Sequence, residues 1–334
     1  MKKQNVFGKK LTAAVVAAST LLLAACSGSS SPAASETATS GTSASETVAS
    51  EAASTADSAA EATTGEAVAE GTIPAPEGDD NVIRVGVSPV PHEQIMADAV
   101  AKQLEEAGWK LEISTFSDYV LPNTSLEADE LDANYFQTLG YMNAQNEEAG
   151  LHLAAVAGVH IEPMGIYSAS LKSIDEIQDG ATVGIPNDTD NGLRALELLV
   201  QKGLLVSTGK VGTDGATFES LTEDAEANPK GLVITPIEAA ALPLNLEDLD
   251  FACVNGNYAL GADLPNKYPA LDIEEFDDDT TVRRTNFLVV KQGNEDTLKT
   301  QALIAATLSP AVEQYITDTY KGAVIASFID APSN

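Results

Sequence analysis

The sequence predicts an α/β fold for the part of the chain that begins at about Asn81. A strand, a helical pattern and a second strand follow one another within about thirty residues, which is typical of a βαβ unit with parallel strands. Strand-like and helical segments then keep alternating as far as residue 320. The stretch from Asn81 to Asn334 is also long enough to bury the core of one large or two medium domains.

The first βαβ unit follows from local residue chemistry. Val82–Val87 is rich in β-branched residues and predicts a strand. A helical pattern follows over Glu93–Ala107 and is closed by Gly108, and Trp109–Phe116 forms the next strand. The same criteria predict helices at 125–130, 133–148, 174–178, 191–202, 295–308 and 311–320, and strands at 153–160, 182–185, 232–234, 251–254 and 286–291.

The N-terminus has the pattern of a lipoprotein signal peptide over residues 1–25. Four lysines precede an apolar run from Leu11 to Leu22, and Leu23-Ala24-Ala25-Cys26 follows. The run is too short to be a stable membrane span. We expect the Cys26 thiol to be lipidated and to become the new N-terminus; the alternative is ordinary cleavage after Ala25 or an uncleaved anchor.

Residues 26–80 are predicted to form a disordered, acidic tether. After Cys26 they consist almost entirely of Ser, Ala, Thr, Glu, Gly, Pro and Asp, with no aromatic residue, Lys or Arg. Such a composition buries too little apolar surface to offset the entropy of ordering the chain. The folded part is therefore expected at the extracytoplasmic face of the cell membrane, held there by lipid.

Charge and ligand residues exclude several classes of function. The chain has 18 Lys+Arg against 50 Asp+Glu, a formal net charge of -32, which argues against a nucleic-acid partner. Two Cys and three His, widely spaced, do not form a metal-site pattern, so neither a metal nor a cofactor is expected. The sequence shows no nucleophile paired with a general base, so it does not indicate an enzyme.

Several segments resemble the methionine-binding lipoprotein family, the NlpA-type substrate-binding proteins of ABC importers. The resemblance runs from about Val82 to Phe328, in family order and at nearly the family's spacings. It is carried by residues 85–89, 116–123, 131–137, 167–168, 186–188 with Arg194, and 255–259.

The resemblance implies a two-lobed fold of the type II periplasmic-binding-protein kind, with two hinge crossovers and the ligand in the interlobe cleft. The first lobe would combine 81–162 with 258–334, and the second would be 163–257. The hinges would lie near Glu162-Pro163 and near Asn255 to Tyr258.

Arg194 is the expected partner of an amino-acid carboxylate. It lies near the start of a predicted helix, where a guanidinium and free backbone N–H groups both favour an anion. The resemblance implies the same role. The alternative is an exposed Arg that pairs with Glu197 or Asp190.

Asn255 and Asn286 are the expected partners of the ligand's polar backbone atoms. Each lies at the end of a predicted strand, where ligands of α/β proteins bind, and an amide oxygen accepts from an ammonium without a buried charge. The role is implied by the resemblance; a turn residue is the alternative for Asn255, which precedes Gly256.

Three aromatic residues are expected to surround the ligand side chain: Tyr119, Phe136 and Tyr141. A thioether packs well against aromatic rings, which suits methionine. Ordinary core packing is the alternative. One departure from the family concerns Thr138, because relatives usually read Phe-Gln-His where this chain reads Phe136-Gln137-Thr138. The exchange leaves more room, or a different polar group, at the far end of the pocket.

The remaining candidates are secondary. His92 is expected at the mouth of the cleft as a capping or supporting residue, and Tyr258 at the hinge. Arg283 and Arg284 are interpreted as solvated surface residues, and the acidic run from Glu274 to Asp279 as a solvated loop.

Two functions follow from these observations. The favoured one is a lipid-anchored receptor that captures methionine or a related amino acid and delivers it to an ABC permease and ATPase complex. The alternative is a surface lipoprotein for adhesion or another interaction that has lost transport function, or a receptor for a different amino acid. Binding of free amino acids distinguishes the two.

Overall fold

The computed structural model describes residues 72–207 and 225–332. The predicted signal peptide, Cys26 and most of the predicted tether lie outside these residues. None of the helices described has both the length and the apolar character that a membrane crossing requires.

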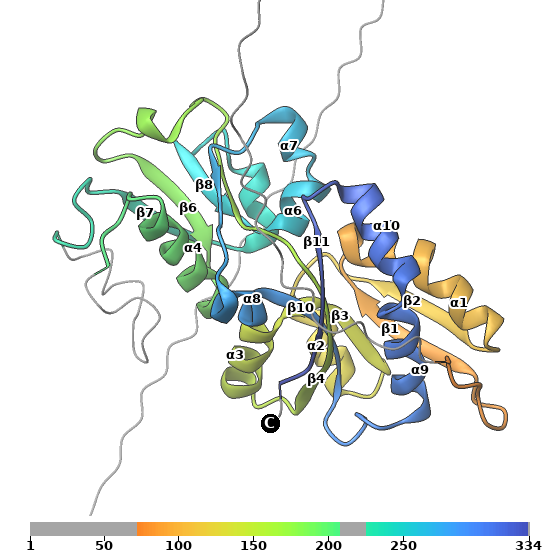
Figure 1. Cartoon of the computed structure of the whole chain (residues 1–334). Coiled ribbons are helices and arrows are strands. Elements are labelled where there is room, and N and C mark those ends of the chain that lie inside the picture. The colour runs from red at the N-terminus through yellow and green to blue at the C-terminus, as the bar shows by residue number, and fades with distance from the viewer. Residues whose placement is uncertain (1–71, 208–224, 333–334) are drawn as a thin grey trace, which may run out of the picture. The chain divides into compact units, whose positions relative to one another are not determined.

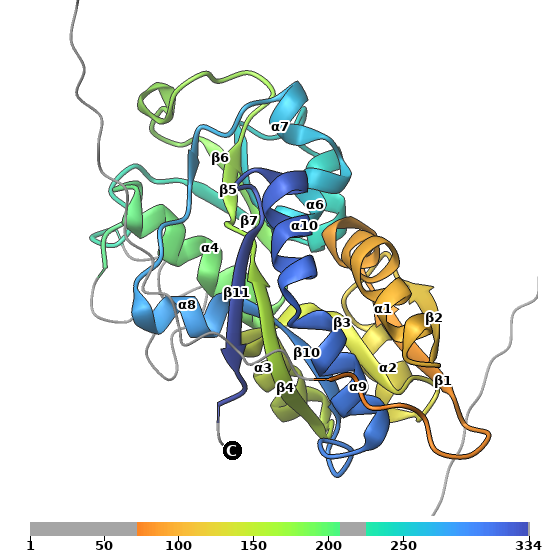
Figure 2. The ribbon, with the colours of Figure 1, turned by 45° about the vertical axis from the view of Figure 1, so that its right-hand side comes forward.

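Two separate β-sheets with helices on their faces make up the described fold, as the α/β prediction requires (Figures 1 and 2). The first sheet has six strands in the order β11-β4-β10-β3-β1-β2, and the second has five in the order β7-β6-β8-β5-β9. The strands of the first sheet are β1 (Val82–Val87), β2 (Lys110–Thr115), β3 (Ala133–Thr138), β4 (Leu153–Ile161), β10 (Thr285–Lys291) and β11 (Ile325–Asp330). Those of the second are β5 (Gly165–Tyr167), β6 (Thr182–Pro186), β7 (Val233–Ile237), β8 (Phe251–Val254) and β9 (Asp272–Ile273).

The first sheet is mixed. Strand β1 pairs in parallel with β2 and β3, whereas β10 runs antiparallel to both β3 and β4. The parallel β1–β2 pair confirms the βαβ unit expected from the sequence. The segment between them is helical through η1 (Pro89–Glu93), η2 (Met96–Val100) and α1 (Ala101–Glu106).

Apolar residues fill both faces of the first sheet. Alternate residues of β1, Ile83, Val85 and Val87, pack on one face with α9 (Leu298–Thr307) and α10 (Pro310–Tyr320). On the other face, Phe287 and Val289 of β10 pack with α2 (Leu121–Glu127) and α3 (Leu139–Ala149). This period of two places successive side chains on opposite faces, so β10 contributes to both cores.

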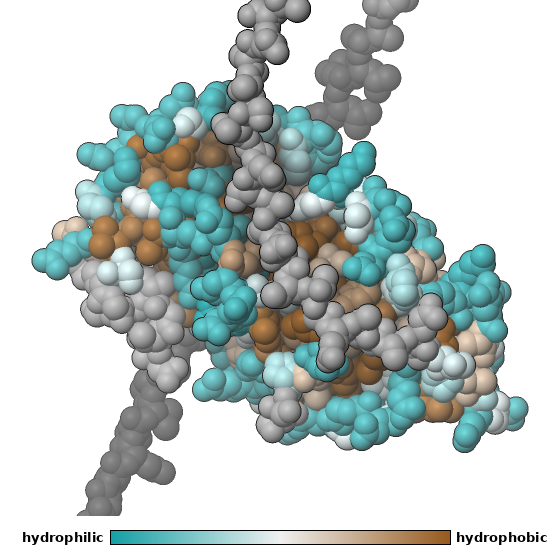
Figure 3. All heavy atoms as spheres, viewed as in Figure 1, coloured by the Kyte–Doolittle hydropathy of each residue, from teal (hydrophilic) through white to brown (hydrophobic). Residues whose placement is uncertain are grey.

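The second sheet is built in the same way. Its larger core contains α4 (Thr189–Gln201), whose Ala195, Leu196 and Leu199 are buried against β6 and β8. The opposite face is covered by η4 (Ala239–Leu244), α6 (Gly256–Gly261) and α7 (Leu264–Lys267). The remaining helical segments are η3 (Ile174–Glu176) and α8 (Asp278–Arg284). Hydrophilic and hydrophobic residues are interspersed on the face shown in Figure 3.

The structure corrects one predicted helix. Residues 133–148 were expected to be helical throughout, but 133–138 form β3 and only the rest is helical, in α3. Every residue of β3 is buried between β1 and β10, so its side chains do not alternate between core and solvent. A strand that is buried on both faces shows neither the two-residue alternation of a half-buried strand nor the 3.6-residue period of an amphipathic helix. Its apolar residues therefore fit a buried helix equally well.

The second crossover also differs from the expectation. Residues 258–284 were assigned to the first lobe, but Asp272 and Ile273 form β9, which pairs with β5 in the second sheet. The chain therefore passes from the first sheet to the second between β4 and β5. It returns between β9 and β10, through α8.

The predicted tether ends too late. Ile73 packs against the core of the first sheet, and the indole Nε1 of Trp109 donates to the Pro74 carbonyl at 2.7 Å. Asp80 pairs with Lys299 at 3.0 Å. Residues 72–80 are therefore part of the folded unit, because partners from distant elements hold them.

Candidate functional site

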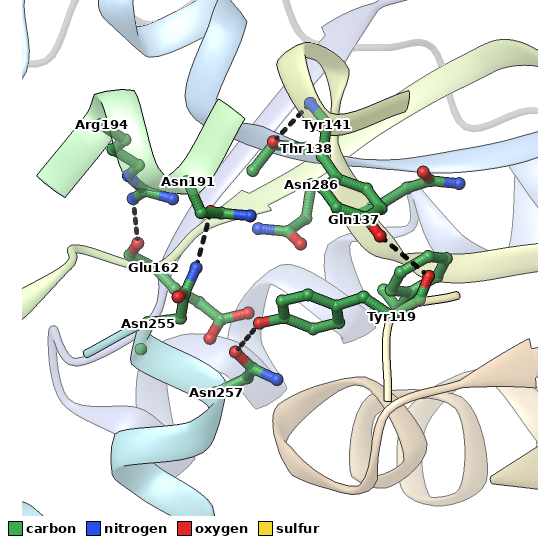
Figure 4. A pocket seen from close by; sticks show the side chains of 12 residues that line it. Tyr119, Gln137, Thr138, Tyr141, Glu162, Asn191, Arg194, Asn255, Asn257 and Asn286 are labelled. Carbon is green, nitrogen blue, oxygen red and sulfur yellow. Dashed lines mark hydrogen bonds between the residues drawn. The ribbon is translucent and has the colours of Figure 1, made fainter. Parts of the chain in front are cut away.

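A pocket lies where segments of the two sheets meet, with about 330 Å³ of space between its walls, part of which is open to solvent (Figure 4). The first-sheet side supplies residues of β3, α3 and β10 and of the loop between β2 and α2, which contains Tyr119. The second-sheet side supplies residues of α4 and of the start of α6. The lining comprises Tyr119, Phe136, Gln137, Thr138, Tyr141, Glu162, Asn191, Arg194, Asn255, Gly256, Asn257 and Asn286.

Arg194 reaches this pocket from α4 and is 3% exposed. Its Nε donates to both carboxylate oxygens of Glu274 at 3.0 Å, and its Nη2 donates to Glu274 Oε2 at 2.6 Å and to the Glu162 carbonyl at 2.8 Å. Nη1 makes no hydrogen bond to any residue that the structure describes. The alternative of an exposed Arg paired with Glu197 or Asp190 is therefore wrong.

Glu274 holds Arg194 in place. Burial alone raises the pKa of the Glu274 carboxyl, but the charge of Arg194 and its hydrogen bonds outweigh burial and hold that pKa below its usual value. The interpretation of the run from Glu274 to Asp279 as a solvated loop is thus wrong for Glu274, whose side chain is only 10% exposed. The composition of the run suggested a surface loop, and no local signal indicated a partner 80 residues away.

Asn255 and Asn286 both line the pocket, and each keeps one amide atom without a protein partner. Asn255 donates its Nδ2 to Asn191 Oδ1 at 2.7 Å, which leaves its buried Oδ1 with no hydrogen bond. Asn286 presents its Oδ1 to His92 Nε2 at 3.1 Å, and its Nδ2 makes no hydrogen bond to the described residues. Asn255 thus keeps a free acceptor and Asn286 a free donor, on segments from the two sides of the pocket.

The three predicted aromatic residues form one cluster. The Tyr119 ring lies 5.8 Å from Phe136 and 5.5 Å from Tyr141, centroid to centroid. Tyr119 also donates its hydroxyl to Asn257 Oδ1 at 2.6 Å, and Tyr141 donates to the Tyr119 carbonyl at 3.2 Å. These bonds fix the rings and give the pocket an apolar wall.

Of the three secondary candidates, one lines the pocket and two contact residues that line it. Thr138 lines the pocket and caps α3, because its Oγ1 accepts from the Tyr141 backbone N–H at 3.3 Å. His92 and Tyr258 do not belong to the lining. His92 supports Asn286 from behind, and the Tyr258 ring lies 4.9 Å from that of Tyr119.

Glu162 is a pocket residue that the sequence reasoning missed. Its Oε1 is 2.8 Å from His160 Nε2, and its Oε2 is buried without a hydrogen-bond partner. Burial raises the pKa of Glu162 to about 7, although the neighbouring His92 and the charge of Arg194 oppose the shift. Its only sequence signal was its place at the expected hinge.

His92, His160 and Glu162 place possible metal-ligand atoms within 4.8 Å of one another. Hydrogen bonds already use several of these atoms. His160 Nε2 bonds to Glu162, His92 Nε2 bonds to Asn286, and the Tyr135 hydroxyl bonds to His160 Nδ1. Burial lowers the pKa of His92 to about 4 and that of His160 to about 3, so both rings are neutral. These hydrogen bonds between neutral rings and the carboxyl group account for the short distances within the cluster.

A second missed feature lies beside the pocket. Arg284 was interpreted as a solvated residue, but its side chain is 1% exposed and pairs with Asp190 and Glu197 of α4. Arg283, 40% exposed, also pairs with Glu197 at 2.8 Å. These residues lie on α8, a helix that the sequence patterns did not predict.

Comparison with known proteins gives consistent matches. The family model described as NlpA lipoprotein matches residues 83–328. The D-methionine-binding lipoprotein MetQ of Escherichia coli is 34% identical over 253 residues, which are 75% of this chain and 89% of that protein. The membrane lipoprotein TpN32 of Treponema pallidum is 31% identical over 247 residues, 74% of this chain and 88% of that protein.

Solved structures show the same fold. A putative lipoprotein from Ruminococcus gnavus is 39% identical with a TM-score of 0.68; the match covers 74% of this chain and 99% of that one. A nutrient binding protein from Burkholderia cenocepacia, solved bound to methionine, is 34% identical with a TM-score of 0.67. That match covers 74% of this chain and all of the other.

Proposed function

Because the chain belongs to the NlpA lipoprotein family, we propose that it is the substrate-binding protein of an ABC importer and binds methionine or a related amino acid. One observation carries the proposal. Several polar atoms of the pocket residues have no hydrogen-bond partner among the described residues. They include two donors, Arg194 Nη1 and Asn286 Nδ2, and two buried acceptors, Asn255 Oδ1 and Glu162 Oε2.

This set matches the head group of a free amino acid. A carboxylate needs donors, and Arg194 Nη1 and Asn286 Nδ2 are donors only. An ammonium needs acceptors, and Asn255 Oδ1 and Glu162 Oε2 provide them. Because buried polar groups without partners are costly, a ligand that supplies these bonds is favoured over an apolar molecule of the same size.

The apolar wall suits a thioether side chain. Tyr119, Phe136 and Tyr141 surround one end of the pocket with aromatic rings, and sulfur packs favourably against such rings. The names of two relatives point the same way, since the Escherichia coli protein is a D-methionine-binding lipoprotein and the Burkholderia structure contains methionine.

Transport then requires no covalent chemistry. The two sheets close around the amino acid, the closed form docks on the permease, and the ligand is released when the lobes open. The lobes bend at the crossovers between β4 and β5 and between β9 and β10. The lipidated Cys26 and the following tether would hold the folded unit at the extracytoplasmic face of the membrane, next to the permease and ATPase complex.

Calorimetric titration of the full chain with each free amino acid, including both enantiomers of methionine, tests the proposal. Saturable binding of methionine or a close relative is expected. Replacement Asn255→Ala should weaken it at least tenfold, because the ammonium loses a charge-assisted bond of about 1.5–3 kcal/mol. Asn266→Ala, an exposed position away from the pocket, is the matched control. No binding across the panel would contradict the proposal and favour the interaction lipoprotein.

A further inference from the structure

The side-chain amide of Asn255, which lines the pocket, can offer a ligand either of two opposite groups. Its Oδ1 accepts hydrogen bonds and its Nδ2 donates them, and the two ends have nearly the same size and shape. An amide that is free to turn would bind an ammonium through the oxygen or a carbonyl oxygen through the nitrogen. Selection for an ammonium therefore requires that the orientation of the amide be fixed.

A chain of hydrogen bonds that starts at the N-terminus of α4 reaches this amide. Asp188 is the N-cap of α4, and its Oδ1 accepts from the Asn191 backbone N–H at 2.9 Å. The same oxygen accepts from Asn191 Nδ2 at 3.0 Å. Asn191 Oδ1 in turn accepts from Asn255 Nδ2 at 2.7 Å (Figure 4). The chain ends at Asn255 Oδ1, which is buried and has no hydrogen-bond partner.

Each step of this chain permits one orientation. A backbone N–H can only donate, so the N-cap position holds an oxygen of Asp188. That oxygen attracts the Nδ2 end of Asn191 and repels its Oδ1 end, so Asn191 turns its oxygen toward Asn255. For the same reason Asn255 must turn its Nδ2 toward Asn191. The group that Asn255 has left for a ligand is therefore an acceptor.

The surroundings strengthen this orientation. Asn191 is 3% and Asn255 5% exposed, so a turned amide would bring two oxygens together with no water to relieve the contact. The other buried acceptor without a partner is near, because a Cβ added to Gly256 would lie 3.1 Å from Glu162 Oε2. This end of the pocket suits a group with several hydrogens to donate, as a protonated amine has.

We propose that Asp188 and Asn191 are positioning residues that keep the oxygen of Asn255 available to the ligand and so make the pocket specific for a protonated α-amino group. The inference rests on the proposed function and narrows its ligand class. Amino acids are accepted, and the corresponding 2-oxo acids, which carry a carbonyl oxygen in place of the ammonium, are rejected. Rejection is strong because that oxygen would meet a buried acceptor that cannot turn.

Competition titration of the full chain with methionine and its 2-oxo acid tests the assignment, since both carry the same carboxylate and thioether. Asn191→Ala removes the acceptor for Asn255 Nδ2, and Asp188→Ala removes the acceptor for Asn191 Nδ2. In each variant Asn255 can turn and donate to the carbonyl oxygen. The dissociation constant of the 2-oxo acid divided by that of methionine should therefore fall about tenfold in both.

Two further variants separate this role from a structural one. Asp188→Asn keeps an oxygen for both Asn191 donors and caps a helix as well as aspartate does, so it should retain the parental ratio. Ser309→Ala removes the N-cap of α10, which does not line the pocket, and should lower stability without changing the ratio. If Asp188→Ala does not fold, Asn191→Ala, which keeps the cap, decides alone. Ratios within threefold of the parent in the folded variants would overturn the positioning role.

A measurement without ligand keeps the inference distinct from the proposed function. The Nδ2 protons of Asn255 can be assigned in NMR spectra by their loss in Asn255→Ala. In the unliganded protein they should exchange with solvent at least tenfold faster in Asn191→Ala than in the parent, and at the parental rate in Asp188→Asn. Equal exchange in Asn191→Ala and the parent would overturn the fixed orientation. If the parent binds no amino acid, the proposed function fails, and the exchange rates still decide whether the amide is held.

Discussion

The guanidinium of Arg194 and the carboxylate of Glu274 form a buried ion pair, with Nη2 and Oε2 2.6 Å apart. The two residues come from α4 and from the segment after β9, and they are 80 positions apart in the sequence. The pair fixes a guanidinium whose remaining nitrogen, Nη1, is free for a ligand.

We expect Glu274→Gln to destabilise the fold strongly. The substitution keeps the shape of the side chain but leaves the Arg194 charge buried without a counter-charge, at a cost of about 3–5 kcal/mol. A ligand carboxylate would replace the missing charge, so methionine should raise the melting temperature more in the variant than in the parent. Chemical denaturation and thermal unfolding measure both effects.

The matched control is Glu275→Gln. Glu275 pairs with Lys202 at 2.7 Å but is 74% exposed, so its loss should change the free energy of unfolding by less than about 1 kcal/mol. Equal effects of the two substitutions would contradict the structural role of Glu274.

Ligand affinity should depend on pH through Glu162. Its pKa is raised to about 7 in the free protein, and an ammonium beside Oε2 favours the charged form, which lowers that pKa in the complex. Binding therefore requires loss of a proton below pH 7. The association constant should be constant between about pH 7.5 and 8.5 and fall by up to about tenfold per pH unit below 7.

Calorimetry in buffers of different ionisation enthalpy measures this effect directly, because binding at pH 6 should release a proton. Glu162→Gln removes the titrating group and should abolish the proton release in this range. Proton release that persists in Glu162→Gln would assign the effect to another group.

Sequence reasoning found the residues whose position follows from local pattern and missed those set by tertiary contacts. Arg194 lies in the first half of α4, and Asn255 and Asn286 lie at strand ends, positions that local patterns can indicate, and all three line the pocket. Glu162 and Glu274 carry no such signal, because their burial depends on partners from distant segments. Their ionisation depends on that burial, and composition alone suggests solvated acids.

The same distinction applies to the fold. Strands β1, β2 and β4 were predicted, and β1 most directly, because a run of β-branched residues that ends in a proline-containing turn defines it. Strand β3 was taken as helix because it is buried on both faces, and β9 was missed because it has only two residues. A short edge strand is specified by the backbone of its neighbour, here β5, and hardly by its own side chains.

Thr138 should control how large a side chain the pocket accepts. Histidine at this position would narrow the pocket, so Thr138→His is expected to lower the affinity for the S-ethyl homologue of methionine relative to methionine by about tenfold, the cost of one misplaced methylene group. It would also remove the hydroxyl that caps α3, at a cost of about 1 kcal/mol in stability. Calorimetric titration with both ligands measures the affinity ratio.

Thr138→Ser separates the two effects, because it retains the capping hydroxyl and enlarges the pocket slightly. Its stability should match that of the parent. An unchanged ratio of affinities in Thr138→His would exclude Thr138 from the side-chain end of the pocket.

A chain that begins at Asn81 should be less stable than one that begins at Thr72. Residues 72–80 contribute the Ile73 contact with the core of the first sheet, the 2.7 Å bond from Trp109 Nε1 to the Pro74 carbonyl and the 3.0 Å pair between Asp80 and Lys299. Partial burial of one aliphatic side chain and one hydrogen bond contribute about 1–3 kcal/mol together. The exposed ion pair adds little.

Because Trp109 is the only tryptophan, its fluorescence should shift to longer wavelength when residues 72–80 are absent. Urea unfolding followed by this fluorescence gives the difference in free energy, and equal midpoints with an unshifted spectrum would place the start of the folded unit at Asn81.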